Sequence, residues 1–168
     1  MKKYIIILLI LILYFKNDLS FNNLKDKKKS TITSINTTDI APPSLRVYYA
    51  IKKYSKLYNI PEKIAFGIAR NETSFKNPMN FNYNHIQISS ANARGTMQVQ
   101  YKTAKYVEPN KEFTKEDLLK NIDLNVNISL KYLRQLYNRY KNWNIALGYY
   151  NTGHPIINNY ATSITNNN

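Results

Sequence analysis

Apolar residues recur at spacings of three and four through most of the segment 44–150, and this pattern restricts the fold more than any other feature. Val47, Ile51 and Tyr54 follow it in one stretch, and a longer stripe runs from Asp123 to Tyr140. Side chains at these spacings share one face of an α-helix. Alternation of apolar and polar residues, as in a half-buried strand, does not occur over any length. The sequence therefore predicts a compact all-α domain of five to seven helices, without internal repeats.

Polar residues, glycine and proline mark the ends of the predicted helices. Ser44 is the predicted N-cap of the first helix, and Pro61 is the predicted first residue of the second. An asparagine-rich stretch, 76–90, has no period and is predicted to be a loop. Gly153 and then Pro155 are typical of residues that follow the end of a helix. The domain is predicted to cover residues 44–157, followed by a frayed polar tail, 158–168.

The N-terminus reads MKKYIIILLILILYF, in which two lysines precede an apolar run from Tyr4 to Phe15. This order is typical of an export signal. Twelve helical residues span about 18 Å, which is less than the ~30 Å hydrocarbon core of a bilayer. Residues 1–18 are therefore predicted to be a signal peptide or a membrane anchor, and the lack of a clear cleavage site leaves both alternatives open. Residues 19–43 are polar and are predicted to be a linker.

The charge balance favours an anionic partner but does not identify one. Lysine and arginine number 24 against 10 acidic residues, for a formal net charge of +14. Nucleic acid, an anionic membrane surface and an acidic wall polymer would all attract such a chain. No nucleic-acid-reading motif is present, and an exported protein has little access to nucleic acid, so no nucleic-acid partner is predicted. Cysteine is absent and histidine occurs only twice, which argues against a metal site or cofactor.

Glu72 lies in an unusual position for a carboxylate. On a helix that begins at Pro61, it follows Ile68 by four residues and precedes Phe75 by three, so it belongs to the apolar face. Desolvation would raise the pKa of such a carboxyl group and allow it to serve as a general acid. The alternative is that the side chain bends out to solvent at the helix end. The stretch by itself leaves both open.

Four short motifs follow one another in a recognisable order. They are ETSF from Glu72, GTMQ from Gly95, NVxxSxxYL from Asn125 and YYNTG from Tyr149. In this order and spacing they resemble the signatures of the lytic transglycosylases with a goose-type-lysozyme-like catalytic domain. The sequence departs from the usual pattern in a few places, such as Thr73 for serine and Ser129 for glycine. The resemblance covers about residues 45–157 and implies a lysozyme-like helical fold.

The resemblance also implies roles for individual residues. Glu72 matches the sole catalytic acid, while Ser89, Gln98, Tyr150 and Asn151 match residues that line the substrate cleft. Tyr150 is expected to hydrogen-bond near Glu72 and to orient it. The alternatives are that Tyr150 is a core tyrosine with a satisfied hydroxyl group and that Gln98 caps the next helix. No metal or cofactor is implied.

The implied reaction is cleavage of the bond between N-acetylmuramic acid and N-acetylglucosamine in peptidoglycan, with formation of a 1,6-anhydro product. One carboxylate suffices, because Glu72 would act first as an acid and then as a base. A lysozyme-type hydrolase on the same fold is an alternative that needs a second carboxylate, for which Asp123 is the one candidate. A non-catalytic, membrane-tethered glycan-binding module is another.

The expected location is the periplasm or cell envelope. Residues 4–15, if they are retained, would anchor the protein to the inner membrane. The predicted partner is the peptidoglycan glycan strand. Contact with the membrane surface, and association with a secretion or conjugation apparatus, stay open.

Overall fold

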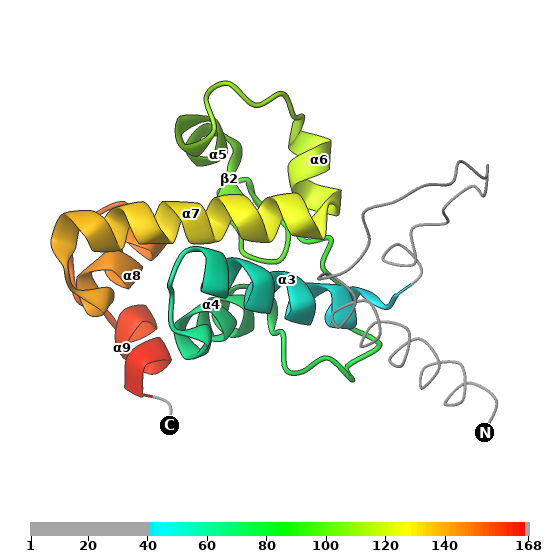
Figure 1. Ribbon diagram of the computed structural model, residues 1–168, viewed down its shortest axis with the longest axis horizontal. Helices are drawn as coiled ribbons and strands as arrows, with labels where there is room; N and C mark the ends of the chain where they lie inside the picture. Colours follow the sequence, from blue (N-terminus) through cyan, green and yellow to red (C-terminus); the bar gives the residue numbers. More distant parts are fainter. Residues whose placement is uncertain (1–40, 167–168) are drawn as a thin grey trace, which may run out of the picture. The chain divides into compact units, whose positions relative to one another are not determined.

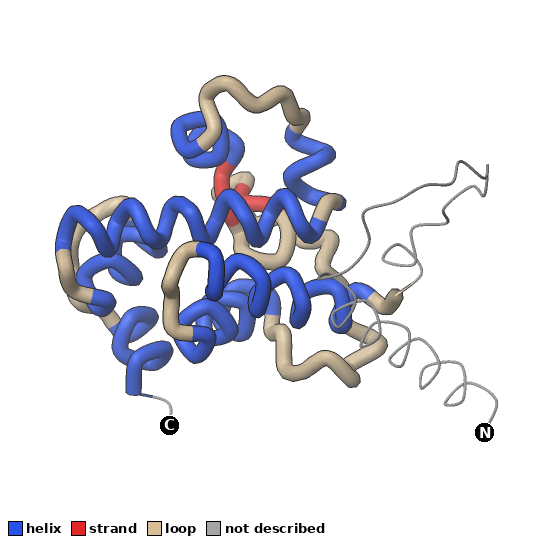
Figure 2. Tube along the Cα trace, viewed as in Figure 1, coloured by secondary structure: helices blue, strands red, loops and turns tan. Residues whose placement is uncertain are grey.

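The computed structural model describes residues 41–166, and the helical domain begins at Pro42. The described part of the chain contains seven α-helices and one short β-hairpin (Figures 1 and 2). The prediction of an all-α domain of five to seven helices is therefore confirmed, apart from the hairpin. The predicted signal or anchor segment, 1–18, lies outside the described residues. Between residues 41 and 166, no helix is both long enough and apolar enough to cross a membrane. The elements are, in order, α3 (Pro43–Leu57), α4 (Glu62–Thr73), β1 (Ala93–Arg94), β2 (Val99–Gln100), α5 (Tyr101–Val107), α6 (Lys115–Lys120), α7 (Ile122–Tyr140), α8 (Trp143–Thr152) and α9 (Asn159–Asn166).

Helix α7 is the central element of the domain. It runs across the helical domain in Figure 1, with α3 beside it, and it also contacts α5, α6 and α8. Val126, Leu130 and Leu133 are fully buried in the main core, while Ile128 of the same helix is buried in a second cluster toward α5 and α6. A helix buried on several sides needs apolar residues around much of its circumference. The long run of helically spaced apolar residues from Asp123 to Tyr140 in the sequence reflects this burial.

Helix α4 carries Glu72, and its ends are fixed by backbone geometry. Pro61 is the N-cap, so the helix begins at Glu62, one residue later than predicted. The left-handed Ser74 (φ 58°) ends it. The prediction that Ser44 caps α3 is wrong. Pro42 occupies the cap position, and the buried Ser44 hydroxyl donates to the carbonyl oxygen of Pro78 at 2.8 Å, which ties α3 to the loop after α4.

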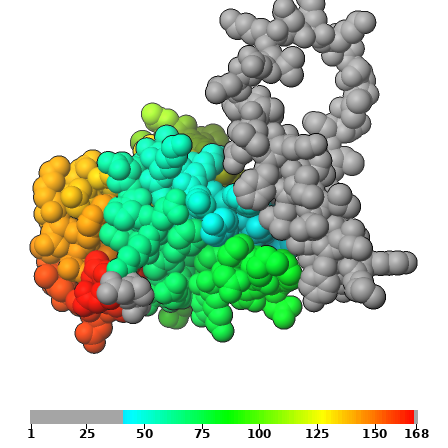
Figure 3. All heavy atoms as spheres, turned by 60° about the horizontal axis from the view of Figure 1, so that its bottom comes forward, coloured from blue at the N-terminus to red at the C-terminus, as the bar shows by residue number. Residues whose placement is uncertain are grey.

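The C-terminal segment forms a helix, so the prediction of a frayed tail from Asn158 is wrong for the described residues. Asn158 accepts a hydrogen bond from the backbone N–H of Ala161, and both Ala161 and Ile164 are buried. Helix α9 packs against α4 and α8, and in Figure 3 its red atoms lie beside the green ones of α4. Ala161 and Ile164 are the two fully buried apolar residues of this helix, and two such residues are too weak a pattern to outweigh the polar composition of the segment in the sequence.

Gly148 allows the chain to return from α8 to α9. A β-carbon at this position would lie 1.7 Å from the carbonyl oxygen of Ile156. Because a main-chain atom cannot move aside as a flexible side chain can, only glycine permits this crossing. The segment after α8 therefore folds back across the helix and brings α9 to the end of α4.

Candidate active site

A cleft of about 410 Å³ lies between the end of α4, the β-hairpin and α8. All five residues predicted for the site line it, namely Glu72, Ser89, Gln98, Tyr150 and Asn151. They come from segments that are up to 79 positions apart in the sequence, so the fold brings together the parts that the motifs predicted. Thr103 of α5 and Tyr132 of α7 complete the walls.

Glu72 is half-buried at the second-last position of α4, so its side chain does not bend out into open solvent. Burial raises the pKa of its carboxyl group, and a hydrogen bond that it accepts opposes part of that effect. The donor is the Tyr160 hydroxyl, at 2.6 Å from Glu72 Oε1. The net effect is a raised pKa. The carboxyl group therefore holds its proton at higher pH than an exposed glutamate, as a general acid requires.

Thr73, where the family pattern has serine, fixes the end of α4. Its buried Oγ1 lies 2.9 Å from the carbonyl oxygen of Thr96 and 2.7 Å from the Tyr83 hydroxyl. These contacts join the residue after Glu72 to the GTMQ motif and to the preceding loop. A threonine satisfies the position because its hydroxyl group can donate and accept.

The GTMQ motif is held by Asn125 of α7. The amide Nδ2 of Asn125 donates to the carbonyl oxygens of Arg94 (2.8 Å) and Leu118 (2.9 Å), and its Oδ1 accepts from the Met97 N–H (2.9 Å). A β-carbon on Gly95, whose φ is +71°, would lie 2.6 Å from the same amide nitrogen. Glycine is required there both by the backbone conformation and by this close approach.

Gln98 and Ser89 face the cleft but are also bonded to the backbone. Gln98 Nε2 donates to the carbonyl oxygens of Gln87 (3.0 Å) and Gly95 (2.9 Å). The alternative that Gln98 caps the next helix is wrong, because Gln100 occupies that position. Ser89 Oγ accepts from the Ala93 N–H at 3.1 Å and so holds the turn that enters the hairpin.

Tyr150 does not donate to Glu72. Its hydroxyl group donates to the carbonyl oxygen of Met97 at 2.7 Å, so it joins the last motif to the second one. Tyr150 was expected to hydrogen-bond near Glu72 and to orient it. This expectation is corrected, because the residue whose hydroxyl group donates to the Glu72 carboxyl group is Tyr160. Burial and then the nearby charge of Glu72 raise the pKa of Tyr150, which keeps its hydroxyl group protonated. Asn151 is exposed, and its Oδ1 accepts from Asn158 Nδ2 at 3.1 Å.

Tyr160 was missed at the sequence level because it lies in the segment predicted to fray. Burial and the neighbouring Glu72 charge raise its pKa well above the ordinary value, so it stays a donor. A weak signal does exist. Asn158 is a good N-cap, and Tyr160, Ala161 and Ile164 have helical spacing.

Glu72 is the one acidic residue among the described residues that line the cleft. Asp123, at the start of α7, does not line the cleft. Its carboxylate accepts a hydrogen bond from the Tyr54 hydroxyl group at 2.5 Å and pairs with Lys53 at 3.1 Å. Over residues 41–166, no group of three histidine or acidic side chains is placed to hold a metal ion. Among the described residues that line the cleft, Glu72 is thus the one carboxyl group that can exchange a proton with a ligand bound there.

Solved structures with a similar fold are lytic transglycosylases. Slt from Pseudomonas aeruginosa, as an inactive mutant, matches with a TM-score of 0.53 and 22% identity, over 62% of this chain and 16% of that one. The 70-kDa soluble lytic transglycosylase Slt70 from Escherichia coli matches with a TM-score of 0.53 and 24% identity, over 70% of this chain and 18% of that one. A structure of the 70-kDa soluble lytic transglycosylase in complex with bulgecin A matches with a TM-score of 0.54 and 24% identity, over 71% of this chain and 19% of that one.

The chain thus corresponds to less than a fifth of the length of these structures. A search of curated proteins gives no significant match. The family model described as the Transglycosylase SLT domain matches residues 49–167, which is most of the chain and includes α9. The resemblance of the four motifs is thereby confirmed, and the chain belongs to the transglycosylase SLT domain family, that of the lytic transglycosylases.

Proposed function

We propose that this protein is a peptidoglycan lytic transglycosylase, which cleaves the β-1,4 bond between N-acetylmuramic acid and N-acetylglucosamine without using water. The observation that carries the proposal is the state of Glu72: a half-buried carboxyl group of raised pKa, bonded to Tyr160, in a cleft that holds no other acidic residue among the described ones. Membership of the family favours the same reaction class.

In the proposed reaction Glu72 acts twice. It first donates its proton to the bridging oxygen as the bond from that oxygen to C1 of the muramic acid breaks. The resulting carboxylate then accepts the proton of the C6 hydroxyl group while that oxygen bonds to C1. The proton lost in the first step is regained in the second, and the product is a 1,6-anhydro sugar. The roles of Ser89, Gln98, Tyr150 and Asn151 would be to hold the substrate along the cleft that they line.

The hydrolase alternative is less well supported. An inverting hydrolase needs a second carboxylate about 6.5–9.5 Å from the first to activate water, and a retaining one needs it closer, at about 5–5.5 Å. Asp123 does not line the cleft and is occupied by Tyr54 and Lys53. The single-carboxylate mechanism fits the groups that are present.

Mass spectrometry of the fragments released from purified peptidoglycan tests the proposed reaction. The expected products end in 1,6-anhydro-muramic acid and are lighter, by one water, than the hydrolysis products. Reducing muramic acid ends would support the hydrolase instead. A known lysozyme, which hydrolyses the same bond, serves as the control digest.

Tyr160→Phe is expected to lower the turnover number about 10- to 100-fold, because a hydrogen bond to a charged group contributes ~1.5–3 kcal/mol. The bond from Tyr160 lowers the pKa of Glu72. Its loss should raise that pKa further, so the decline of activity at alkaline pH should move to higher pH. Rate–pH profiles of the wild type and the variant would measure both effects.

Tyr58→Phe is the matched control for this change. It removes a hydroxyl group that donates to Asn127 Oδ1 at 2.5 Å, away from the cleft. A similar loss of activity in both variants, or an unmoved pH profile in Tyr160→Phe, would show that Tyr160 acts only on stability.

Export to the cell envelope belongs to the same proposal. The basic start and the apolar run 4–15 support it, as does a substrate that lies outside the cytoplasm. Retention of this segment would anchor the enzyme at the inner membrane. The 1,6-anhydro chemistry fits wall turnover, division and the opening of the wall for a secretion or conjugation apparatus equally well.

A further inference from the structure

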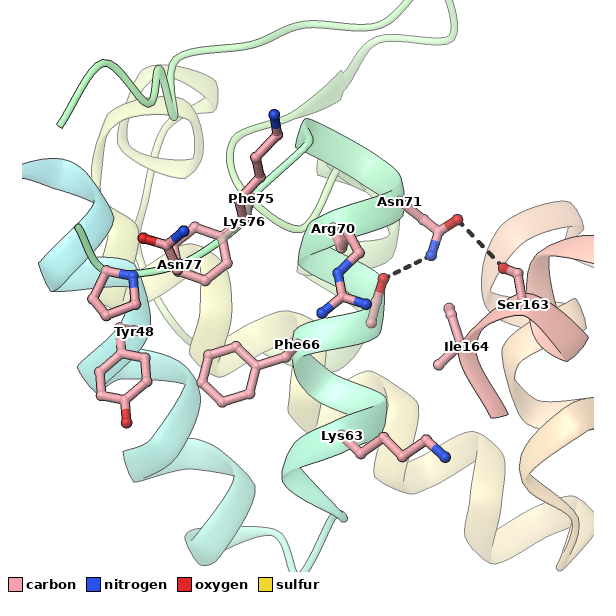
Figure 4. Close-up of a pocket in the computed structure, with 12 residues that line it drawn as sticks. Tyr48, Lys63, Phe66, Arg70, Asn71, Phe75, Lys76, Asn77, Ser163 and Ile164 are labelled. Atoms are coloured by element: carbon pink, nitrogen blue, oxygen red, sulfur yellow. Dashed lines mark hydrogen bonds between the residues drawn. The ribbon is translucent and has the colours of Figure 1, made fainter. Parts of the chain in front are cut away.

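A second hollow of about 410 Å³ lies across α4 and shares no lining residue with the cleft of Glu72. Figure 4 shows how it extends from Tyr48 of α3, across Phe66 and Arg70 of α4, to Ile164 of α9. We call this hollow the α4 groove. Its volume is within the range of about 300–1,000 Å³ that is typical of ligand sites. Nothing in the proposed reaction uses it.

Aromatic rings form one wall of the α4 groove. Phe66 stacks on Tyr48 with ring centroids 5.4 Å apart and on Phe75 with centroids 6.1 Å apart. At the other side Ile164 approaches Gly67 so closely that a β-carbon there would lie 2.7 Å from Ile164 Cγ2. The lack of a side chain at position 67 thus allows Ile164 to pack directly on α4 and to form the opposite side of the groove. The groove can therefore receive an apolar side chain of a partner, as buried anchors of protein interfaces do.

The charged side chains that line the α4 groove are all positive. They are Lys63, Arg70 and Lys76, and each is exposed. No acidic side chain of the described residues lines the groove, and none of the ion pairs in that part of the chain involves these three cations. Three unpaired cations around an apolar hollow are complementary to a ligand that carries carboxylates beside an apolar group.

We propose that the α4 groove is a docking site for an acidic peptide segment of a partner protein. An aromatic or leucine side chain of that segment would pack on Phe66, and its flanking carboxylates would pair with Lys63, Arg70 and Lys76. An anionic membrane is less well matched, because the cations surround a concave apolar site. A partner bound in the groove would leave the catalytic cleft open, since the two share no lining residue.

Fluorescence anisotropy with the full chain tests this proposal directly. The probe is a labelled synthetic peptide, Asp-Glu-Phe-Leu-Asp-Glu, with blocked ends. The double variant Lys63→Glu/Arg70→Glu is expected to bind it at least about tenfold more weakly, equivalent to ~1.4 kcal/mol. Lys111→Glu is the matched control, because Lys111 is exposed in the loop before α6 and does not line the groove. It should bind the peptide almost as well as the wild type.

Two further peptides separate the contributions to binding. Replacing the acids by Asn and Gln, or Phe-Leu by Gly-Gly, should each weaken binding to the wild type. The proposal is overturned if either peptide binds equally well, if the probe does not bind, or if the double variant and Lys111→Glu lose equal affinity. It is also overturned if the double variant loses binding only to phosphatidylglycerol vesicles. Should the double variant not fold, Lys63→Gln/Arg70→Gln replaces it. None of these readouts depends on catalysis.

Discussion

Glu72→Gln is expected to lower the release of anhydro-muropeptides at least about 10³-fold, within the 10²–10⁴-fold that general acid–base catalysis contributes. The amide cannot donate a proton to the leaving oxygen and cannot accept one from the C6 hydroxyl group, so both steps fail. Its shape is that of a protonated carboxyl group, and it can still accept from Tyr160. Solubilisation of labelled peptidoglycan, followed over time, measures the rate.

Glu116→Gln is the control for this variant, since Glu116 is an exposed carboxylate that pairs with Lys120 on the surface. It should keep full activity. Unchanged turnover in Glu72→Gln would exclude the catalytic assignment. A wild-type protein that binds glycan strands but releases no fragments would instead support the non-catalytic module.

The same variant has a consequence for stability, and its sign follows from the raised pKa of Glu72. Between its unfolded and folded pKa values, this carboxyl group binds more protons in the folded state, so stability falls as pH rises through that window. Glutamine has no such dependence. Glu72→Gln should therefore raise the melting temperature relative to wild type above the folded pKa. The gain should disappear below the unfolded pKa. A gain that is independent of pH would contradict the burial of a titrating carboxyl group.

The family resemblance of the motifs predicted the composition of the cleft, and for the motifs on α4 and α8 the local apolar pattern supports the prediction. Glu72 faces inward since Ile64 and Ile68 of α4 are buried, and helical spacing alone carries that information. Tyr150 and Asn151 lie in the last turn of α8, where the apolar residues Ala146 and Leu147 fix its inner face. Local patterns thus determined which way these side chains point.

The partners of those side chains could not be predicted in the same way. Whether Tyr150 bonds to Glu72 or to the carbonyl oxygen of Met97 depends on the backbone path of the GTMQ motif. That path brings the Met97 carbonyl oxygen to 2.7 Å from the Tyr150 hydroxyl group. Tyr160 reaches Glu72 across 88 positions of sequence, and this requires the return of the chain over Gly148. The two-residue strands of the hairpin are too short to give any alternation. The partner of Tyr150, the partner of Glu72 and the hairpin all depend on contacts between residues far apart in the sequence.

Asn125→Ala is expected to destabilise the domain by about 3–9 kcal/mol. Each buried backbone group that loses its partner costs ~1–3 kcal/mol, and Asn125 satisfies three: Met97 N–H and the carbonyl oxygens of Arg94 and Leu118. The side chain is only 1% exposed, so water cannot readily replace it. Small domains have a total stability of about 5–15 kcal/mol. Urea denaturation of the variant and the wild type measures the difference.

Asn127→Ala, two residues along the same helix, is the matched control. Asn127 is half-buried and accepts one hydrogen bond, from Tyr58, so its loss should cost only about 1 kcal/mol. Asn125→Asp keeps the acceptor for Met97 N–H but places a buried carboxylate oxygen against the carbonyl oxygens of Arg94 and Leu118, so it should destabilise the domain at least as much as Asn125→Ala. Equal stability of Asn125→Ala and Asn127→Ala would mean that the GTMQ motif keeps its shape without α7. In that case the backbone path that places the Met97 carbonyl oxygen under Tyr150 would have to be set by the loop itself.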